Sequence, residues 1–383
     1  MLLALTAGGY ALPAPLLPVL LDRGAKRPQQ RPVIVGALSP LDRRYAHENP
    51  VWRYASPQTD YYEGLRAFWR ATTDRAERQG LLRQARGLNP EWGRRLLEGS
   101  WKSLQDRERH ALFDHMRQGL NERDEPFLEM ALDDRSQPVR RKAAELLAHL
   151  PTSRLARRMA ARINEIVRYT PDGAHSIEIA FPPALDAATV RDGVLARSGK
   201  NLAHLRGLQL IEMVSAVPLD HWSTTWAIRP AAVVLAMRAS LWPRTLTQAL
   251  CLAAVRQGNA HWTAALLDAT ELHEHALRAA PALSLAECDR LLDRWDATLP
   301  VAAPLNKDAK LIQLLRQRSG PWSVAMTRRL WHQLASQRAP DEQRLDHAAS
   351  AVVKQMGANC PPHLLEEGLA LFDRLPPTIQ EIR

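Results

Sequence analysis

The stretch DEPFLEMALDDRSQPVRRKAAELLAHLPTSRLARRM, residues 124–159, decides the fold of this chain. Its apolar residues recur every three or four positions, which is the periodicity of helices that bury one face. A polar turn near Arg135 and the proline Pro151 interrupt this pattern. The stretch therefore predicts a helix, a tight turn, a second helix and, directly after Pro151, a third.

The expected helix starts are marked by residues that favour them. Asp124 is a candidate N-cap, because its carboxylate can accept from the N–H groups of the first turn. Pro126 and Pro138 stand at first-turn positions, where a missing N–H group costs nothing. Ser153 can cap the third helix.

The turn and the second helix resemble the HEAT repeat. Asp134, Pro138, Val139 and Arg140 stand where that repeat has an aspartate turn, a proline and a Val-Arg pair. In HEAT repeats the aspartate and the arginine link neighbouring repeats. The resemblance therefore implies a structural role for Asp134 and Arg140, and it is specific for this one repeat.

A second resemblance covers most of the chain. The phrases NPVWRYA, LNPEW, DEPFLEMALDDR, VPLDHW and VRDGV resemble an uncharacterised bacterial family of helical-repeat proteins. This implies a fold but no established activity. It also implies a protein partner, an ATPase of the MoxR type or a von Willebrand A-like protein, because these are encoded near such proteins.

The helical pattern repeats upstream of residue 124. Leu82, Phe113 and Leu146 occupy similar places in three expected helices, 31 and 33 residues apart, and a second helix follows each. Helix pairs of this period bury their apolar faces only by stacking on neighbouring pairs. We therefore predict an all-α fold, an α-solenoid of antiparallel HEAT-like helix pairs.

Four parts are expected along the chain. Residues 1–57 are rich in proline and predict an irregular N-terminal cap, and 58–168 predict HEAT-like repeats. Residues 169–199 predict a central loop insertion with a small extended segment and a short helix. Helical repeats resume over 200–383, with a linker expected at 301–308.

Composition limits the class of protein. Hydrophobic residues make up 46% of the chain, which is ample for a core. The net charge of +10 comes from 44 arginines and only 7 lysines against 41 acids. Such an arginine excess is typical of a GC-rich genome, but arginine also favours phosphate or carboxylate partners because its planar fork binds them bidentately.

Cysteine spacing and the N-terminus bear on the cellular compartment. The three cysteines lack CxxC spacing, so we expect Cys251 to be a buried free thiol in a reducing, cytoplasmic setting. The first 21 residues carry no charge, but no basic region precedes them and three prolines interrupt them. We therefore expect no membrane segment.

Basic residues of the decisive stretch are the first candidate site. Arg154, Arg158 and Arg162 share a helical face, and the expected basic ridge comprises Arg140, Arg141, Arg154, Arg157, Arg158 and Arg162. One interpretation is a phosphate-binding ridge. The other is a solvated outer face, on which the arginines pair with acids such as Glu145 and Glu165.

Aromatic residues supply weaker alternatives. Asp220, Trp222 and Trp226 resemble the aspartate and tryptophans that HEAT-like alkylpurine DNA glycosylases use, although Asp220 also fits an N-cap and tryptophans usually fill cores. Tyr45 and Trp52, among arginines in 40–55, fit a stacking platform for bases or, as we favour, a hydrophobic cap.

No catalytic signature was found. The sequence has no Gly-rich phosphate loop, no serine elbow and no metal-ligand spacing, so we predict no cofactor and no metal. The favoured function is a non-enzymatic scaffold or adaptor that binds a protein. The alternative is a nucleic-acid-binding protein, at its extreme a glycosylase-like enzyme.

Overall fold

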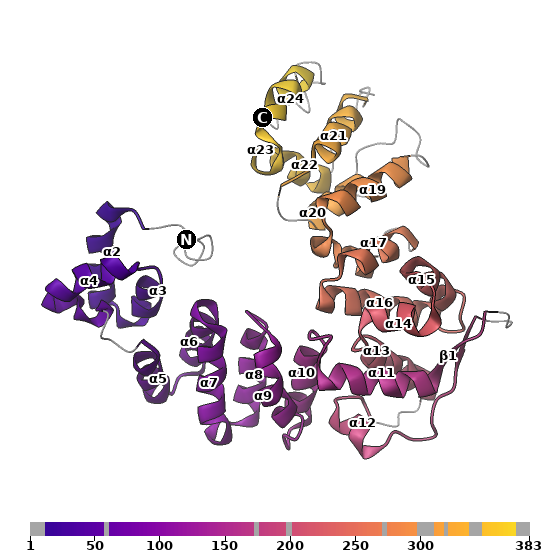
Figure 1. The fold of residues 1–383 in the computed structure, drawn as a ribbon, viewed down its shortest axis with the longest axis horizontal. Helices are drawn as coiled ribbons and strands as arrows, with labels where there is room; N and C mark the ends of the chain where they lie inside the picture. The colour runs from indigo at the N-terminus through magenta and orange to yellow at the C-terminus, as the bar shows by residue number, and fades with distance from the viewer. Residues whose placement is uncertain are drawn as a thin grey trace. The chain divides into compact units, whose positions relative to one another are not determined.

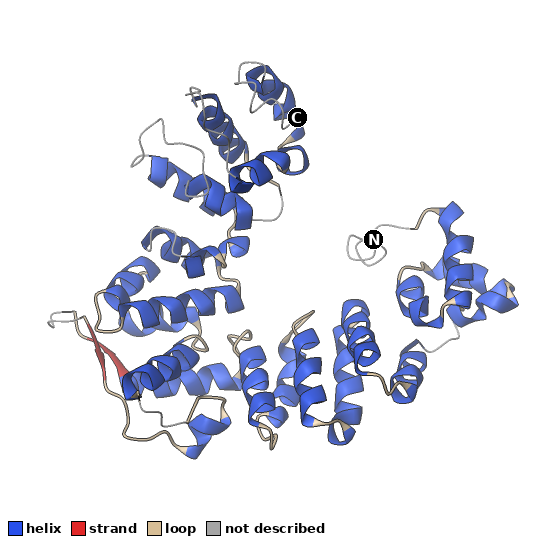
Figure 2. Ribbon diagram, turned by 180° about the vertical axis from the view of Figure 1, so that it is seen from behind, coloured by secondary structure: helices blue, strands red, loops and turns tan. Residues whose placement is uncertain are grey.

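The computed structural model describes residues 12–56, 61–171, 176–196, 201–269, 274–296, 310–317, 321–336 and 347–372. These residues form helices joined by short turns, with one two-stranded antiparallel sheet (Figures 1 and 2). The expected all-α class is therefore confirmed. The chain divides into two compact units, Met1–Ser153 with Asp186–Gly193 and Arg154–Leu185 with Val194–Arg383.

The first unit begins with helices where an irregular segment was expected. They are η1 (Ala14–Leu16), α2 (Leu17–Lys26), η2 (Pro28–Gln30), α3 (Arg31–Gly36), α4 (Pro40–Glu48) and η3 (Pro50–Ala55). The expectation of irregular structure is therefore wrong for residues 12–56. The prolines that suggested it stand at the first or second position of each helix, where no N–H donor is needed.

The rest of the first unit is helical where repeats were predicted. Its helices are α5 (Tyr61–Ala71), α6 (Arg75–Leu88), α7 (Pro90–Ser100), η4 (Trp101–Ser103), α8 (Asp106–Met116), η5 (Glu122–Asp124), α9 (Glu125–Ala131), α10 (Gln137–Leu147) and α12 (Ala187–Arg191). Helix α8 packs between α6 and α10, while α7 packs on α6 and α9 packs on α10 (Figure 1). Leu82, Phe113 and Leu146 are all buried, as their repeated spacing predicted.

A buried ion pair joins these helices. Arg86 of α6 is 1% exposed, and its two terminal nitrogens lie 2.9 Å from the two carboxylate oxygens of Asp124. The same guanidinium donates to the carbonyl oxygens of Pro90, Met116 and Gln118, each at 2.8 Å. The arginine therefore connects α6 with the start of α7, the end of α8 and the start of α9.

Asp124 thus differs from its expected role. The sequence predicted a carboxylate that caps the helix beginning after it, but α9 receives no side-chain cap from Asp124. The carboxylate instead binds Arg86 and accepts from the backbone N–H of Asn121 at 3.2 Å. Burial decides this, since a charge that is 1% exposed needs an opposite charge nearby.

The second unit contains the remaining elements. They are α11 (Arg154–Ile166), β1 (Val167–Tyr169), β2 (Ile177–Ile179), α13 (Leu202–Val214), α14 (Leu219–Trp226), α15 (Pro230–Arg238), α16 (Pro243–Gln257), α17 (Ala260–Ala269), α18 (Glu274–Leu277), η6 (Ala280–Ala282), α19 (Leu285–Asp296), α20 (Lys310–Gln317), α21 (Val324–Ser336), α22 (His347–Lys354), α23 (Met356–Asn359), η7 (Pro362–Leu364) and α24 (Leu365–Phe372). Helix α16 packs against α13, α15 and α17.

Several details of the second unit agree with the sequence. The expected extended segment is β2, which pairs with β1 in the register Val167↔Ile179. Ser284 and Glu287 stand at capping-box spacing, and they form one, because Ser284 N–H donates to Glu287 and Glu287 N–H donates back to the Ser284 hydroxyl. The expected linker at 301–308 lies outside the described residues. Across the described ranges, no helix is both long and apolar enough to cross a membrane.

We expect Arg86→Met to lower the free energy of unfolding by about 3–5 kcal/mol, because it leaves the Asp124 carboxylate buried without its partner. Urea denaturation followed by circular dichroism measures this loss. The control is Arg66→Met, which removes a half-exposed pair with Glu63 and should change the free energy by less than about 1 kcal/mol. Adding Asp124→Leu to Arg86→Met should recover part of the lost free energy of unfolding. Equal losses in Arg86→Met and in the control Arg66→Met would contradict this account.

Cys251 provides a pH-dependent prediction. The thiol is free and buried, as expected, and burial raises its pKa to about 12. The raised pKa keeps the sulfur protonated, so alkylation at pH 8 should be at least about a thousandfold slower than for an ordinary cysteine. Mass spectrometry after iodoacetamide treatment tests this, and rapid labelling of the folded protein at Cys251 would disprove it.

Candidate binding surface on the N-terminal helices

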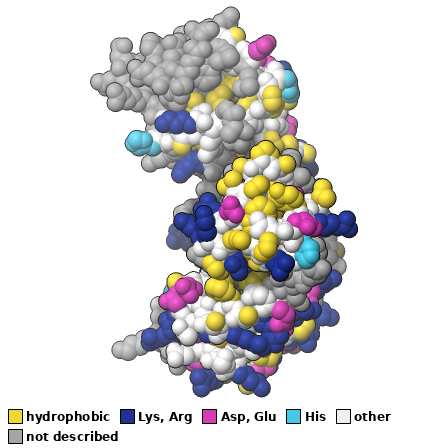
Figure 3. Space-filling model, turned by 90° about the vertical axis from the view of Figure 1, so that its left-hand side faces the viewer, with side chains coloured by type: hydrophobic (Ala, Val, Ile, Leu, Met, Phe, Trp, Pro, Cys, Tyr) yellow, Lys and Arg dark blue, Asp and Glu magenta, His cyan; other side chains and the backbone are white. Residues whose placement is uncertain are grey.

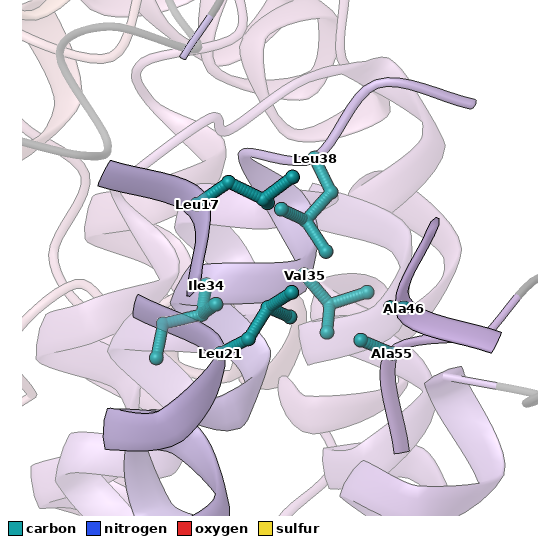
Figure 4. Close-up of a cluster of buried hydrophobic side chains, with 7 residues drawn as sticks. All are labelled: Leu17, Leu21, Ile34, Val35, Leu38, Ala46 and Ala55. Carbon is teal, nitrogen blue, oxygen red and sulfur yellow. The ribbon is translucent and has the colours of Figure 1, made fainter. Parts of the chain in front are cut away.

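The N-terminal helices have a core of their own. Leucine, isoleucine, valine and alanine side chains from α2, α3, α4, η3 and the turn between α3 and α4 point toward one another in Figure 4. They are Leu17, Leu21, Ile34, Val35, Leu38, Ala46 and Ala55. Each of them is at most 7% exposed. This cluster fixes which face of each short helix points inward and therefore which face points outward.

Tyr54 fastens η3 to α2. Its hydroxyl donates to the carbonyl oxygen of Leu21 at 2.9 Å, and burial raises its pKa to about 12. The ring passes so close to Gly24 that a Cβ atom there would lie 2.1 Å from the tyrosine oxygen. Arg31 covers the other side, with its guanidinium 4.6 Å from the ring centre and its Nε donating to the Gly24 carbonyl.

The outward faces of these helices carry large apolar side chains. Leu41 is 74% exposed, and the full set comprises Leu16, Val19, Leu41, Tyr45 and Val51, which we call the N-terminal apolar surface. Figure 3 shows hydrophobic side chains gathered over the N-terminal helices, with Lys and Arg as well as Asp and Glu side chains around them. Water-exposed apolar groups collected in this way are typical of a binding site.

Trp52 connects two of the helices that carry this surface. Leu41 and Tyr45 lie one turn apart on α4, and the Tyr45 ring centre lies 5.8 Å from that of Trp52. The Trp52 indole donates to the Asp22 carboxylate at 2.7 Å, and Asp22 lies three residues after Val19 on α2. Trp52 therefore bridges the outward face of α4 and the outward face of α2.

Positive charge surrounds the apolar side chains. Residues 12–56 contain seven Lys or Arg and three Asp or Glu, a net charge of +4. Arg23 lies one turn from Val19 on α2, and Arg44 lies three residues from Leu41 on α4. The exposed cations of this region are Arg23, Lys26, Arg27, Arg44 and Arg53. The region thus combines exposed apolar side chains with a net positive charge.

A pocket of about 490 Å³ lies elsewhere in the first unit. Its lining residues are Asn89, Pro90, Glu91, Arg94, Asn121, Glu122, Arg123, Asp124 and Leu150. The acids of this lining already have partners, because Asp124 binds Arg86, Glu91 binds Arg95 and Glu122 accepts from Thr152. Its charges therefore serve the protein's own packing.

The expected basic ridge divides between the two units. Arg140 and Arg141 lie on α10 of the first unit, and Arg140 donates to the backbone carbonyls of Asp134 and Arg135 at 2.7 and 3.2 Å. On α11 of the second unit, two arginines are exposed and two are half-buried, in the order Arg154, Arg157, Arg158 and Arg162. The exposed members of the predicted ridge are thus Arg141 on α10 and, on a basic face of α11, Arg154 and Arg157.

The HEAT-like positions lie at a junction between helices. Asp134 is 8% exposed, and its carboxylate lies 3.2 Å from Arg109 of α8 and accepts from the N–H of Ser136. Pro138 stands in the first turn of α10, and Val139 is fully buried. Asp134 therefore binds Arg109 of α8, while Arg140 donates to backbone carbonyl oxygens of the turn between α9 and α10.

The glycosylase-like residues are part of the second unit's packing. Asp220 lies in the first turn of α14, where the N-cap is Pro218, so its expected role as the cap was wrong. Its carboxylate accepts from the Trp262 indole at 2.9 Å. Trp222 is 1% exposed, and Trp226 stacks on Tyr169 with ring centres 5.1 Å apart.

His221 lies beside these tryptophans. Its Nε2 atom lies 2.8 Å from the side-chain oxygen of Asn164, and burial lowers the pKa of the imidazole. Among the residues that the structure describes, no three His, Cys, Asp or Glu side chains are grouped to hold a metal ion.

Sequence reasoning missed the apolar surface, although it selected residues 40–55. The signal was the pair Leu41 and Tyr45, one turn apart, whose spacing indicates a helix face but not its exposure. Tyr54 packs partly against the core, whereas Tyr45 is 51% exposed. The hydrophobic cap predicted for residues 40–55 therefore describes only the side chains of this stretch that face the core.

Comparisons with known proteins give a family but no function. No curated protein and no solved structure matches the chain. A family model described as a family of unknown function, DUF5691, matches residues 1–381. The chain therefore belongs to the DUF5691 family.

Proposed function

We propose that this protein is a non-enzymatic scaffold or adaptor that binds a protein partner through the N-terminal apolar surface. The observation that carries the proposal is the grouping of Leu16, Val19, Leu41, Tyr45 and Val51 in water, over a core that is already complete without them. A MoxR-type ATPase or a von Willebrand A-like protein is the first partner to test, on the resemblance described above.

Burial of this surface supplies the driving force for binding. Each Å² of apolar area removed from water contributes about 25 cal/mol. Tyrosine and tryptophan contribute strongly at interfaces because they combine a large apolar ring with a polar atom. The Tyr45 and Trp52 rings contact each other, and the hydrogen bond from the Trp52 indole to Asp22 holds the indole in place before a partner binds.

The stacked helices provide a firm frame for such a surface. We propose that α6 to α10 are HEAT-like antiparallel pairs, supported by the packing of α8 between α6 and α10. Arg86 with Asp124 and Arg109 with Asp134 each hold two elements of this stack together. Helix α3 packs on α6, so the N-terminal helices rest on the first of these pairs.

Nucleic-acid binding is the second candidate function. It is favoured by the basic face of α11, where Arg154 and Arg157 are exposed. Such a face would bind phosphates, with an affinity that falls steeply as salt rises. Substitutions in α11 therefore provide the control that separates this candidate from the scaffold.

The test is photo-cross-linking in cells of the encoding organism, with p-benzoylphenylalanine in place of Tyr45. We expect a discrete adduct with one other protein, and we expect Val19→Asp with Leu41→Asp to reduce it at least about tenfold. Both substituted side chains are more than half exposed and occupy first-turn positions of α2 and α4, where a carboxylate favours the helix. The double variant should therefore fold normally, which its thermal melting curve checks.

Two controls accompany this experiment. The photoreactive residue at Leu241, an exposed position in the second unit, should give no such adduct. Arg154→Glu with Arg157→Glu should leave the Tyr45 adduct unchanged but abolish any salt-dependent binding of labelled duplex DNA. An adduct that survives in the double aspartate variant, or one formed only between copies of this chain, would refute the proposed function.

A further inference from the structure

We infer that the N-terminal apolar surface binds an acidic amphipathic helix of the partner. The inference rests on the proposed function and specifies the chemistry of its ligand. Such a helix presents apolar side chains at spacings of three and four residues, with Asp or Glu beside them. The following features of residues 12–56 match those properties.

The apolar part of the surface fits side chains from one face of a helix. Leu41 and Tyr45 form a one-turn pair on α4, and Leu16 and Val19 are three residues apart where η1 leads into α2. The surface therefore offers two short apolar strips on α4 and α2, and Trp52 connects these two helices through Tyr45 and Asp22.

The acids of this region are mostly committed to its own fold. The carboxylate of Asp22 accepts from the Trp52 indole, and that of Asp42 accepts from the N–H of Ser39 within a capping box. Arg23 and Arg44 are exposed beside the apolar residues. A ligand that carries carboxylates next to its own apolar side chains would complement both the charge of these arginines and the apolar residues beside them.

Other occupants fit these charges less well. In a second copy of the chain, residues 12–56 would bring their net charge of +4 against the same charge, which is repulsive at short range. An anionic membrane would attract the arginines, but it would also have to accept the exposed carboxylates of Asp22 and Glu48 among the apolar residues.

The experiment selects the ligand without assuming its sequence. The full-length protein is presented to a display library of helical 16-residue peptides, and peptides that also bind the Val19→Asp, Leu41→Asp variant are removed. We expect the retained peptides to be acidic, with Asp or Glu beside Leu, Ile or Phe at helical spacing. Isotherms of the best peptide should weaken about tenfold in Arg23→Glu with Arg44→Glu.

The control changes the same number of charges elsewhere. Arg154→Glu with Arg157→Glu alters the net charge of the protein equally but lies on α11, so it should leave the peptide affinity unchanged. An equal loss in this control would show a general charge effect and would overturn the inference. Basic or neutral peptides among those retained would overturn it as well.

The remaining outcomes separate this inference from the proposed function. Vesicles of phosphatidylcholine with phosphatidylglycerol are tested in parallel. If the protein binds these vesicles but no peptide, and if the Val19→Asp, Leu41→Asp variant loses the vesicle binding, the occupant of the surface is a membrane. A selection that retains no peptide would also end the inference. The cross-linked adduct at Tyr45 tests the proposed function independently. If Val19→Asp with Leu41→Asp removes this adduct but no acidic peptide is retained, the proposed function stands, the inference fails, and the partner binds through a segment of different chemistry.

Discussion

A guanidinium removed from water must find a partner for every one of its donors, and Arg86 does so within the first unit. Two of its bonds reach the Asp124 carboxylate, and three reach backbone carbonyls at Pro90, Met116 and Gln118. Desolvation makes such a pair costly to bury, but it makes the loss of either member costlier still. The arginine thereby fixes the start of α7, the end of α8 and the start of α9 relative to α6. The packing of the helices in the first unit depends on this alignment.

Room for this arginine has to be provided by a neighbour. A Cβ atom at Gly93 of α7 would lie 2.5 Å from the Arg86 side chain, so the absence of a side chain there lets α7 approach α6. Arg109 repeats the arrangement less completely, with Asp134 at 3.2 Å and the Trp101 ring 5.4 Å from its guanidinium. Polar interactions of this kind specify the alignment of the helices, while Phe113 and its buried neighbours supply most of the burial.

Much of the helical part of the fold could be predicted from periodicity and proline positions. The stretch from Asp124 to Met159 predicted three helices, and the structure contains them as α9, α10 and α11. The N-terminal helices were missed because prolines at helix starts look like prolines in loops when no long apolar period follows them. Arg86 was missed for a different reason, since the sequence does not show that an arginine is buried and Asp124 lies 38 residues away.

The candidate surface was harder to predict than the fold. On α4 the sequence offers Leu41 and Tyr45 as the obvious inward face, yet the small Ala46 is the buried residue and both large side chains point outward. Close packing against Leu17, Leu21 and Val35 favours the small side chain at that place, and only the tertiary arrangement reveals it. The basic residues of α10 and α11 were prominent in the sequence, but their division between two units could not be read from their spacing.

The exposed valine and leucine in the first turns of α2 and α4 have a consequence for protein engineering. Acidic residues at both positions would favour these helices more than Val19 and Leu41 do. A redesign that optimises stability or solubility would therefore replace these two residues early. It would yield a better-behaved protein whose N-terminal helices had lost their apolar face, so activity screens of this family should begin from the unmodified sequence.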